Sequence, residues 1–157
     1  MGYYVSGNEG PMEEVLISRQ SARKFAPDEV RGKIFHFFAC HTGSAGTTIP
    51  YLGQAMIVSG AVAFFGYSDQ VQMHVPESAV FCDCDIAVDK ALMALQSCDD
   101  AYRTSIDLYD KSIARFRANG DHQAAARLEH NRNALVAPST IPMYGDKTAR
   151  LEQTTIK

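Results

Sequence analysis

The sequence predicts an α/β domain built on a mostly parallel sheet with flanking helices. Two apolar runs bounded by turn residues, 34–40 and 61–65, predict buried strands. The segment 49–59 between them has helical spacing, and most of the second half of the chain is helical. A strand, a helix and a second strand in this order predict a right-handed crossover unit with parallel strands.

Length and charge limit the class of protein. A chain of 157 residues predicts one domain, 1–157, with a single core. Its 46% apolar and 21% charged residues are ordinary for a soluble globular protein, and its net charge of −3 predicts binding to neither nucleic acid nor a membrane. The apolar stretches are too short to span a bilayer, and the start lacks the pattern of a signal peptide.

The four cysteines, Cys40, Cys82, Cys84 and Cys98, are irregularly spaced. A chain of this size needs no disulfide framework, so we expect a reducing compartment, the cytoplasm. Cys82 and Cys84 form a C-D-C-D run, but no second Cys/His pair with zinc-finger spacing accompanies it. The sequence therefore predicts no metal and no cofactor.

Several short elements are expected in the first half of the chain. The segments 3–5 and 15–17 predict short strands. The run 34–40 predicts a central strand that ends at Cys40, and its one polar member, His36, is expected to be a satisfied core or sheet-face histidine.

Glycines are expected to end the next two elements. The helix at 49–59 should end at Gly60, and the strand at 61–65 should stop at Gly66.

Apolar residues in the second half alternate steps of three and four, which indicates a helix face. They are Val88, Leu92, Leu95, Tyr102, Ile106, Tyr109, Ile113 and Phe116. Ser97, with Asp100 three residues later, predicts that a helix restarts there.

A further helix and a strand are expected after this face. Gly120 should end the stretch, and Asp121 should cap the next helix. The inner face of that helix is predicted to consist of Ala124, Ala125, Leu128 and Leu135. Pro138 and Pro142 bracket a last short strand that should end near 143–144.

Cys40 stands where the predicted strand 34–40 meets the glycine turn 41–46. Ligands in open α/β sheets bind beyond the carboxyl ends of such strands. A thiol in that position faces solvent from a rigid support, as a cysteine nucleophile requires. Cys40 is therefore the candidate catalytic residue.

A cysteine nucleophile needs a base, and the other histidines supply candidates. His41 is adjacent to Cys40 in a turn, and His74 lies in a segment after the second strand. His122 and His130 fall on the late helix and are expected to be solvated.

Two longer stretches have a characteristic order and spacing. The first is FACHTG at 38–43, followed by LG at 52–53 and GAVAFFGY at 60–67, and the second is YGDKTARL at 144–151. Together they resemble the caspase-like (clan CD) cysteine peptidases, in particular the bacterial CHAT and gingipain-like branches. Lys147 stands where the gingipain-like ending usually has a proline.

The resemblance implies a three-layer caspase-like fold and a catalytic Cys/His dyad. Cys40 matches the nucleophile, but Asn8 occupies the position of the dyad histidine. Asparagine carries no proton at neutral pH, so the loss of acid–base catalysis would cost roughly 10²–10⁴-fold. The family also has two strands and a helix before that motif, so we expect either a pared-down domain or the C-terminal part of a longer one.

Other roles follow from the resemblance alone. It implies an oxyanion site from the backbone N–H of Cys40 and, less closely, of Glu9 or Gly10, with the turn Thr42-Gly43 orienting the first of these. It places the substrate pocket at Tyr67, Ser68, Asp69 and Gln70. An inward-pointing Asp69 would favour a basic side chain before the scissile bond.

Two functions from different classes follow. The favoured one is a caspase-like domain with a degenerate peptidase site that acts through protein or peptide contacts. The alternative is an active cysteine endopeptidase, with Cys40 as nucleophile and His41 or a displaced or externally supplied histidine as base. An unrelated anion-binding domain stays open, because the turn 43–46 precedes a helix, but it lacks the lysine of a P-loop.

The missing first strands would leave a sheet edge beside 3–5 unpaired. Unpaired edges invite pairing with another chain. The sequence therefore predicts a partner segment or a homo-oligomer formed through this edge.

Overall fold

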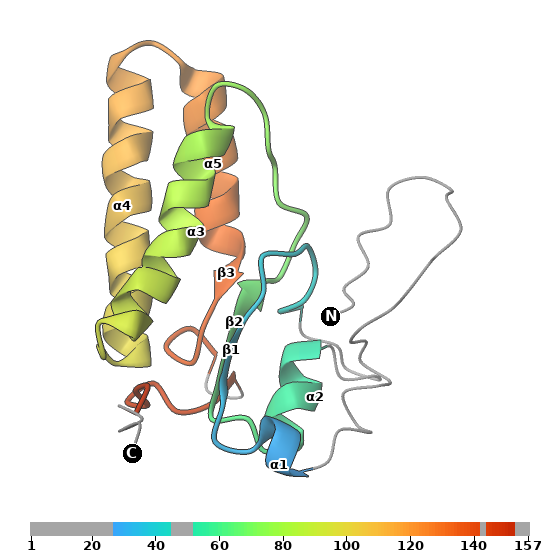
Figure 1. Cartoon of the computed structure of the whole chain (residues 1–157). Helices are drawn as coiled ribbons and strands as arrows, with labels where there is room; N and C mark the ends of the chain where they lie inside the picture. The colour runs from blue at the N-terminus through green and yellow to red at the C-terminus, as the bar shows by residue number, and fades with distance from the viewer. Residues whose placement is uncertain (1–26, 45–51, 142–143, 153–157) are drawn as a thin grey trace.

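The computed structural model describes residues 27–44, 52–141 and 144–152, which form a mixed α/β arrangement (Figure 1). The elements in chain order are α1 (Pro27–Val30), β1 (Ile34–His36), α2 (Leu52–Val58), β2 (Ala63–Tyr67), α3 (Ser78–Met93), α4 (Cys98–Ala118), α5 (His122–Ala134) and β3 (Leu135–Val136). No helix in these ranges combines the length and the apolar character needed to cross a membrane.

The described strands form a small mixed sheet in the order β1-β2-β3. Strands β1 and β2 are parallel, with Phe35 opposite Phe64, and they are joined through α2, as the crossover prediction requires. Strands β2 and β3 are antiparallel, with Gly66 opposite Val136. Among the described strands β2 is therefore the central one, so the expectation that 34–40 is central is wrong for this part of the sheet.

Strand β1 is shorter than predicted, and Cys40 is not at its end. The strand ends at His36, although the Phe37 N–H still donates to the Phe65 carbonyl. Cys40 lies in a turn that begins beyond Phe38, and the Thr42 hydroxyl closes this turn by donating to the Ala39 carbonyl at 3.0 Å.

Strand β2 lies two residues later than predicted, at Ala63–Tyr67, because Gly66 does not stop it. A Cβ at Gly66 would lie 2.5 Å from Thr42 Oγ1. The missing side chain lets the turn containing Thr42 lie against β2, and the strand continues to Tyr67. Gly66 is thus a site of close approach and not a strand breaker.

The predicted helix caps are confirmed. Ser97 Oγ accepts a hydrogen bond from the Asp100 N–H, and Asp121 Oδ1 accepts one from the Ala124 N–H. Gly60 ends α2 with a φ of +108°. Leu95, expected on the helix face, instead lies between α3 and α4 with a φ of +60°.

The last predicted strand is wrong in position. Strand β3 follows α5 directly and includes Leu135, which was expected on the face of α5. Residues after it turn, with the Thr140 N–H donating to the Ala137 carbonyl at 3.0 Å. Residues 142–143 lie outside the described ranges.

The two faces of β2 pack against different helices. Phe64 joins a cluster with Leu52 and Met56 of α2. Phe65 faces the other way and packs with Val88 of α3. Figure 1 shows α3, α4 and α5 on one side of the sheet and α2 on the other.

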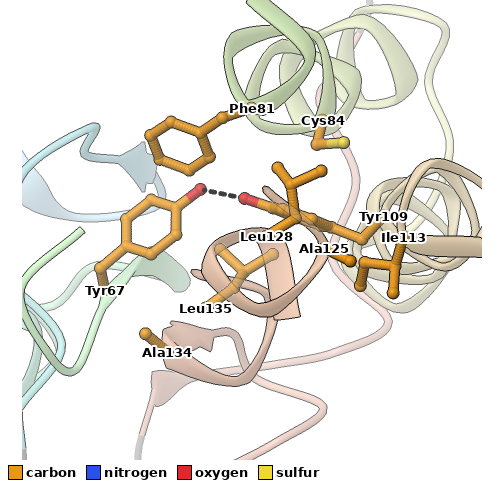
Figure 2. Close-up of a cluster of buried hydrophobic side chains, with 9 residues drawn as sticks. All are labelled: Tyr67, Phe81, Cys84, Tyr109, Ile113, Ala125, Leu128, Ala134 and Leu135. Atoms are coloured by element: carbon orange, nitrogen blue, oxygen red, sulfur yellow. Dashed lines mark hydrogen bonds between the residues drawn. The ribbon is translucent and has the colours of Figure 1, made fainter. Parts of the chain in front are cut away.

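The end of β2 and helices α3 to α5 share a separate apolar cluster around Tyr67 (Figure 2). The Tyr67 side chain is fully buried there, and its hydroxyl lies 3.3 Å from that of Tyr109. This cluster fixes the position at which β2 passes into the loop that faces Cys40.

Candidate functional site

The structure brings most of the predicted site residues together. Cys40, His41, Thr42 and Gly43 lie in one turn, and Tyr67 and Asp69 lie in the segment beside it. Asn8, Glu9 and Gly10 lie outside the described residues, as do the predicted strands 3–5 and 15–17.

The turn and the segment after β2 run antiparallel to each other. The Gly43 N–H donates to the Tyr67 carbonyl at 2.9 Å, and the His41 N–H donates to the Asp69 carbonyl at 3.3 Å. Ser44 Oγ adds a hydrogen bond to the Ser68 carbonyl at 2.6 Å. The segment after β2 therefore positions the turn that carries Cys40.

Thr42 and Tyr67 are parts of the framework. The Thr42 side chain is fully buried, and its hydroxyl accepts a hydrogen bond from the Tyr67 N–H while donating to the Ala39 carbonyl. The Tyr67 hydroxyl donates to Asp85 at 2.8 Å. Burial and the Tyr109 and Asp85 side chains raise the pKa of Tyr67 well above its usual value. Neither side chain reaches solvent.

The Cys40 thiol is half-buried, and its Sγ accepts a hydrogen bond from the Val71 N–H at 3.3 Å. All five histidines of the chain lie among the described residues, and none of them hydrogen-bonds this sulfur. His41 is exposed and has a φ of +58°, and His74 is exposed as well. The structure thus contains no hydrogen-bonded Cys/His dyad within the described ranges.

Helix α5 holds the loop that contacts Cys40. Asn131 is fully buried, and its amide accepts from the Gln72 N–H at 2.7 Å and donates to the Gln72 carbonyl at 2.8 Å. His130 was expected to be solvated. It is instead half-buried, and its Nε2 lies 2.9 Å from the Gln70 carbonyl. The only sequence signal for this contact was a polar asparagine on the inner face of an otherwise apolar helix.

A buried ion pair fixes the far end of the same loop. Glu77 is fully buried and pairs with Arg127 of α5. The hydrogen bond from this guanidinium lowers the pKa of Glu77. The loop is therefore attached to α5 at both Gln72 and Glu77.

His36 is a satisfied core histidine, as predicted. Its Nδ1 lies 2.9 Å from Asp89 and its Nε2 lies 3.1 Å from Asp85, both on α3. Burial lowers the pKa of His36, but the hydrogen bonds and charges of the two carboxylates outweigh it and raise the value to about 9. Both ring nitrogens therefore carry protons at neutral pH, which excludes His36 as a base for Cys40.

The remaining cysteines are not arranged as a metal site. Cys82 and Cys84 lie on α3, and burial raises the pKa of Cys84 to about 12. Burial also raises the pKa of Cys98 to about 11. Within the described residues no group of three or more His, Cys, Asp or Glu side chains is placed to hold a metal ion.

No protein-family model matches this chain, and no curated protein or solved structure matches it either.

Proposed function

We propose that this chain is a caspase-like domain whose cysteine peptidase site is degenerate and which acts by binding a protein or peptide. The single observation that carries the proposal is the environment of Cys40. Its sulfur is paired with the Val71 N–H and with no histidine of the chain. A thiol peptidase needs a base to form the thiolate and an acid to protonate the leaving amine.

Two of the histidines support this proposal, because they form hydrogen bonds with groups other than the Cys40 thiol. His36 is held by two carboxylates of α3, and His130 is held at the Gln70 carbonyl. Asn8, at the position that the resemblance assigns to the dyad histidine, has no ionisable side chain.

The arrangement around β2 supports the caspase-like part of the proposal. Helices lie on both sides of the sheet, as a three-layer fold requires, and the turn with Cys40 follows the carboxyl end of β1. The four cysteines are free, as expected of a protein of the reducing cytoplasm, where we place it.

The alternative, an active endopeptidase, is favoured by one contact. The Val71 N–H points at the Cys40 sulfur, and a donor in that position stabilises a thiolate. Such an enzyme would take its base from His41 after a rearrangement, or from a partner. An Asp69 that faces the substrate would then favour basic residues before the cleaved bond.

Peptide hydrolysis by the full chain tests the proposal. A mixture of peptides covering basic, acidic and apolar residues is incubated with the wild type, with Cys40→Ala and with His41→Ala, and cleavage is read by mass spectrometry. We expect the same background rate for all three. Cleavage that is lost in Cys40→Ala would overturn the proposal, and its loss in His41→Ala as well would identify the base.

Alkylation of the thiols against pH gives a second test that needs no substrate. Cys82 is also half-buried and serves as the internal reference. We expect Cys40 to be alkylated no faster than Cys82 at neutral pH. Much faster alkylation of Cys40 than of Cys82 at neutral pH would instead show an activated thiolate and favour the alternative.

We propose that a partner binds at a sheet edge, which the sequence places beside 3–5, outside the described residues; among the described strands the outer edge of β1 is unpaired. The Lys33 carbonyl and the Phe37 N–H form hydrogen bonds with β2. Because hydrogen-bonding directions alternate along a strand, the backbone N–H and C=O groups of Ile34 and His36 point away from β2. Among the described strands none pairs with that edge. A single monomeric species at all concentrations in sedimentation would contradict self-association through this edge.

A further inference from the structure

A cavity of about 610 Å³ lies beside β3, next to the Cys40 turn. It is bounded by Gly43 of that turn, by α4 and by the end of α5. Its apolar wall consists of Ile106, Leu135, Val136 and Ile141. Ligand sites usually measure about 300–1,000 Å³ and combine an apolar wall with a few polar groups, so this cavity has the size and composition of such a site.

The charge of the cavity favours an anion. Among the described lining residues Arg132 is the one charged side chain, and none is acidic. The nearest carboxylate that Arg132 contacts is Asp110 on α4, which is half-exposed and outside the lining. A ligand carboxylate would therefore meet one fixed cation in the wall of the cavity and would share it with Asp110, which lies outside the lining.

Arg132 is held in place by hydrogen bonds that leave some of its N–H groups free for a ligand. Its Nε and Nη2 donate to Asn133 Oδ1 at 3.2 and 3.0 Å, and Nη1 donates to Asp110. A guanidinium has five N–H groups, so one remains on each terminal nitrogen. Its fixed orientation reduces the entropy lost when it binds a planar carboxylate.

Tyr102 supplies a second polar group. It lines the cavity with Arg132, and its side chain is half-buried. Burial raises the pKa of Tyr102, the charge of Arg132 lowers it and the charge of Asp110 raises it, so both charged groups lie near the hydroxyl. The neutral hydroxyl can donate to the same ligand oxygen that Arg132 attracts.

We propose that this cavity binds a carboxylate attached to a small apolar body, with Arg132 and Tyr102 as the polar anchors. Both the carboxyl terminus of a peptide with an aliphatic last residue and a free medium-chain carboxylic acid have this chemistry. The proposal is independent of whether Cys40 hydrolyses peptides, because its two polar anchors, Arg132 and Tyr102, are not part of the thiol site.

Methyl-labelled isoleucine makes the test specific to the site, because Ile106 and Ile141 both line the cavity. The full chain is titrated with the tripeptide Ala-Ala-Leu, with its carboxyl-terminal amide and with octanoate, and the methyl shifts of these residues give each Kd. We expect the free tripeptide to bind at least about tenfold more tightly than the amide, since hydrogen bonds to a charged group are the strong ones. Tighter binding of octanoate than of the tripeptide would identify a free acid as the ligand type.

Variants separate this site from general charge attraction. Arg132→Gln should weaken binding of the free acid at least about tenfold, and Tyr102→Phe should weaken it several-fold. Arg117→Gln is the matched control, because Arg117 also forms an exposed helix–helix ion pair, with Glu129, but does not line the cavity. Equal affinity for acid and amide, equal effects of the two arginine variants, or no methyl shift at millimolar ligand would each overturn the proposal.

Discussion

The His36 side chain pairs with two carboxylates. Its ring connects β1 to Asp85 and Asp89 of α3, and Asp85 in turn accepts from the Tyr67 hydroxyl. Two strands and a helix therefore meet at one buried carboxylate. Removing a single partner of such a set leaves a buried charge without compensation, which is strongly destabilising.

The charge of His36 makes stability depend on pH. Its pKa is raised from about 6.5 in the unfolded chain to about 9 in the folded one, so its contribution is complete below pH 6.5 and is lost as the pH rises through 9. We expect the free energy of unfolding in urea to fall between pH 7 and pH 10 by a few kcal/mol. His122→Gln, a change at an exposed histidine, should keep this slope and His36→Gln should lose it. A wild-type stability that is flat across this range would contradict the argument.

The buried hydroxyl of Thr42 makes a second prediction at this scale. Thr42→Val removes the hydroxyl that donates to the Ala39 carbonyl and accepts from the Tyr67 N–H. Both backbone groups then lose this hydrogen-bond partner. We expect a loss of about 1–3 kcal/mol in urea unfolding, because a buried polar group without a partner is costly. Thr42→Ser keeps the hydroxyl and should lose clearly less. Equal losses in the two variants would mean that the hydrogen bonds contribute little.

Helix α5 determines the loop conformation as well as the packing of the core. It contacts the loop after β2 through Arg127, His130 and Asn131, which recur at helical spacing along one side of the helix. Because the Val71 N–H of that loop reaches the Cys40 sulfur, α5 controls the thiol indirectly.

Loosening this contact should expose the thiol. Asn131→Ala removes both hydrogen bonds to Gln72, whereas Asn133→Ala, on the exposed side of the same helix, removes none of them. We expect faster hydrogen exchange at the Gln72 amide and faster alkylation of Cys40 in Asn131→Ala only. If both variants alkylate at the wild-type rate, the loop is held by other contacts.

The molecule as a whole has separate apolar clusters joined through β2. The cluster around Tyr67 ties α3, α4 and α5 together, and the cluster around Phe64 holds α2. Because neighbouring residues of one strand serve the two sides of the sheet, damage to either cluster should reach the other through β2.

Truncation of the larger cluster tests this coupling. Leu128 is fully buried in it, and Leu128→Ala should cost about 2–5 kcal/mol. Met93→Ala, at a side chain that is 77% exposed, is the control and should cost little. We expect amides of both α2 and α5 to exchange faster in Leu128→Ala. Faster exchange confined to α5 would mean that the clusters unfold independently.

Features with local causes were predictable from the sequence. The caps at Ser97 and Asp121 need only a side chain and an N–H three residues away, so spacing was sufficient. The ends of β1 and β2 depend on the approach of Thr42 to Gly66, which are far apart in the chain, and spacing cannot predict such contacts.

The candidate site follows the same division. The nearness of Cys40 to the segment after β2 was predictable from the strand–helix–strand order, since the ends of parallel strands meet at one edge of a sheet. The hydrogen bonds of His36 with α3 and of Asn131 with Gln72 join residues that are distant in sequence. The sequence pattern alone could not identify these pairs, because they form only in the folded structure.

The turn around Cys40 is completed by residues that are synthesised much later. The Tyr144 hydroxyl donates to the Gly43 carbonyl, and the Val136 side chain occupies the space above Gly43 that a Cβ would need. During translation the turn emerges from the ribosome about a hundred residues before these contacts are available. A nascent chain therefore carries an incomplete turn until Tyr144 has emerged, and a chaperone or a thiol reagent would find Cys40 more accessible during that interval than in the folded protein.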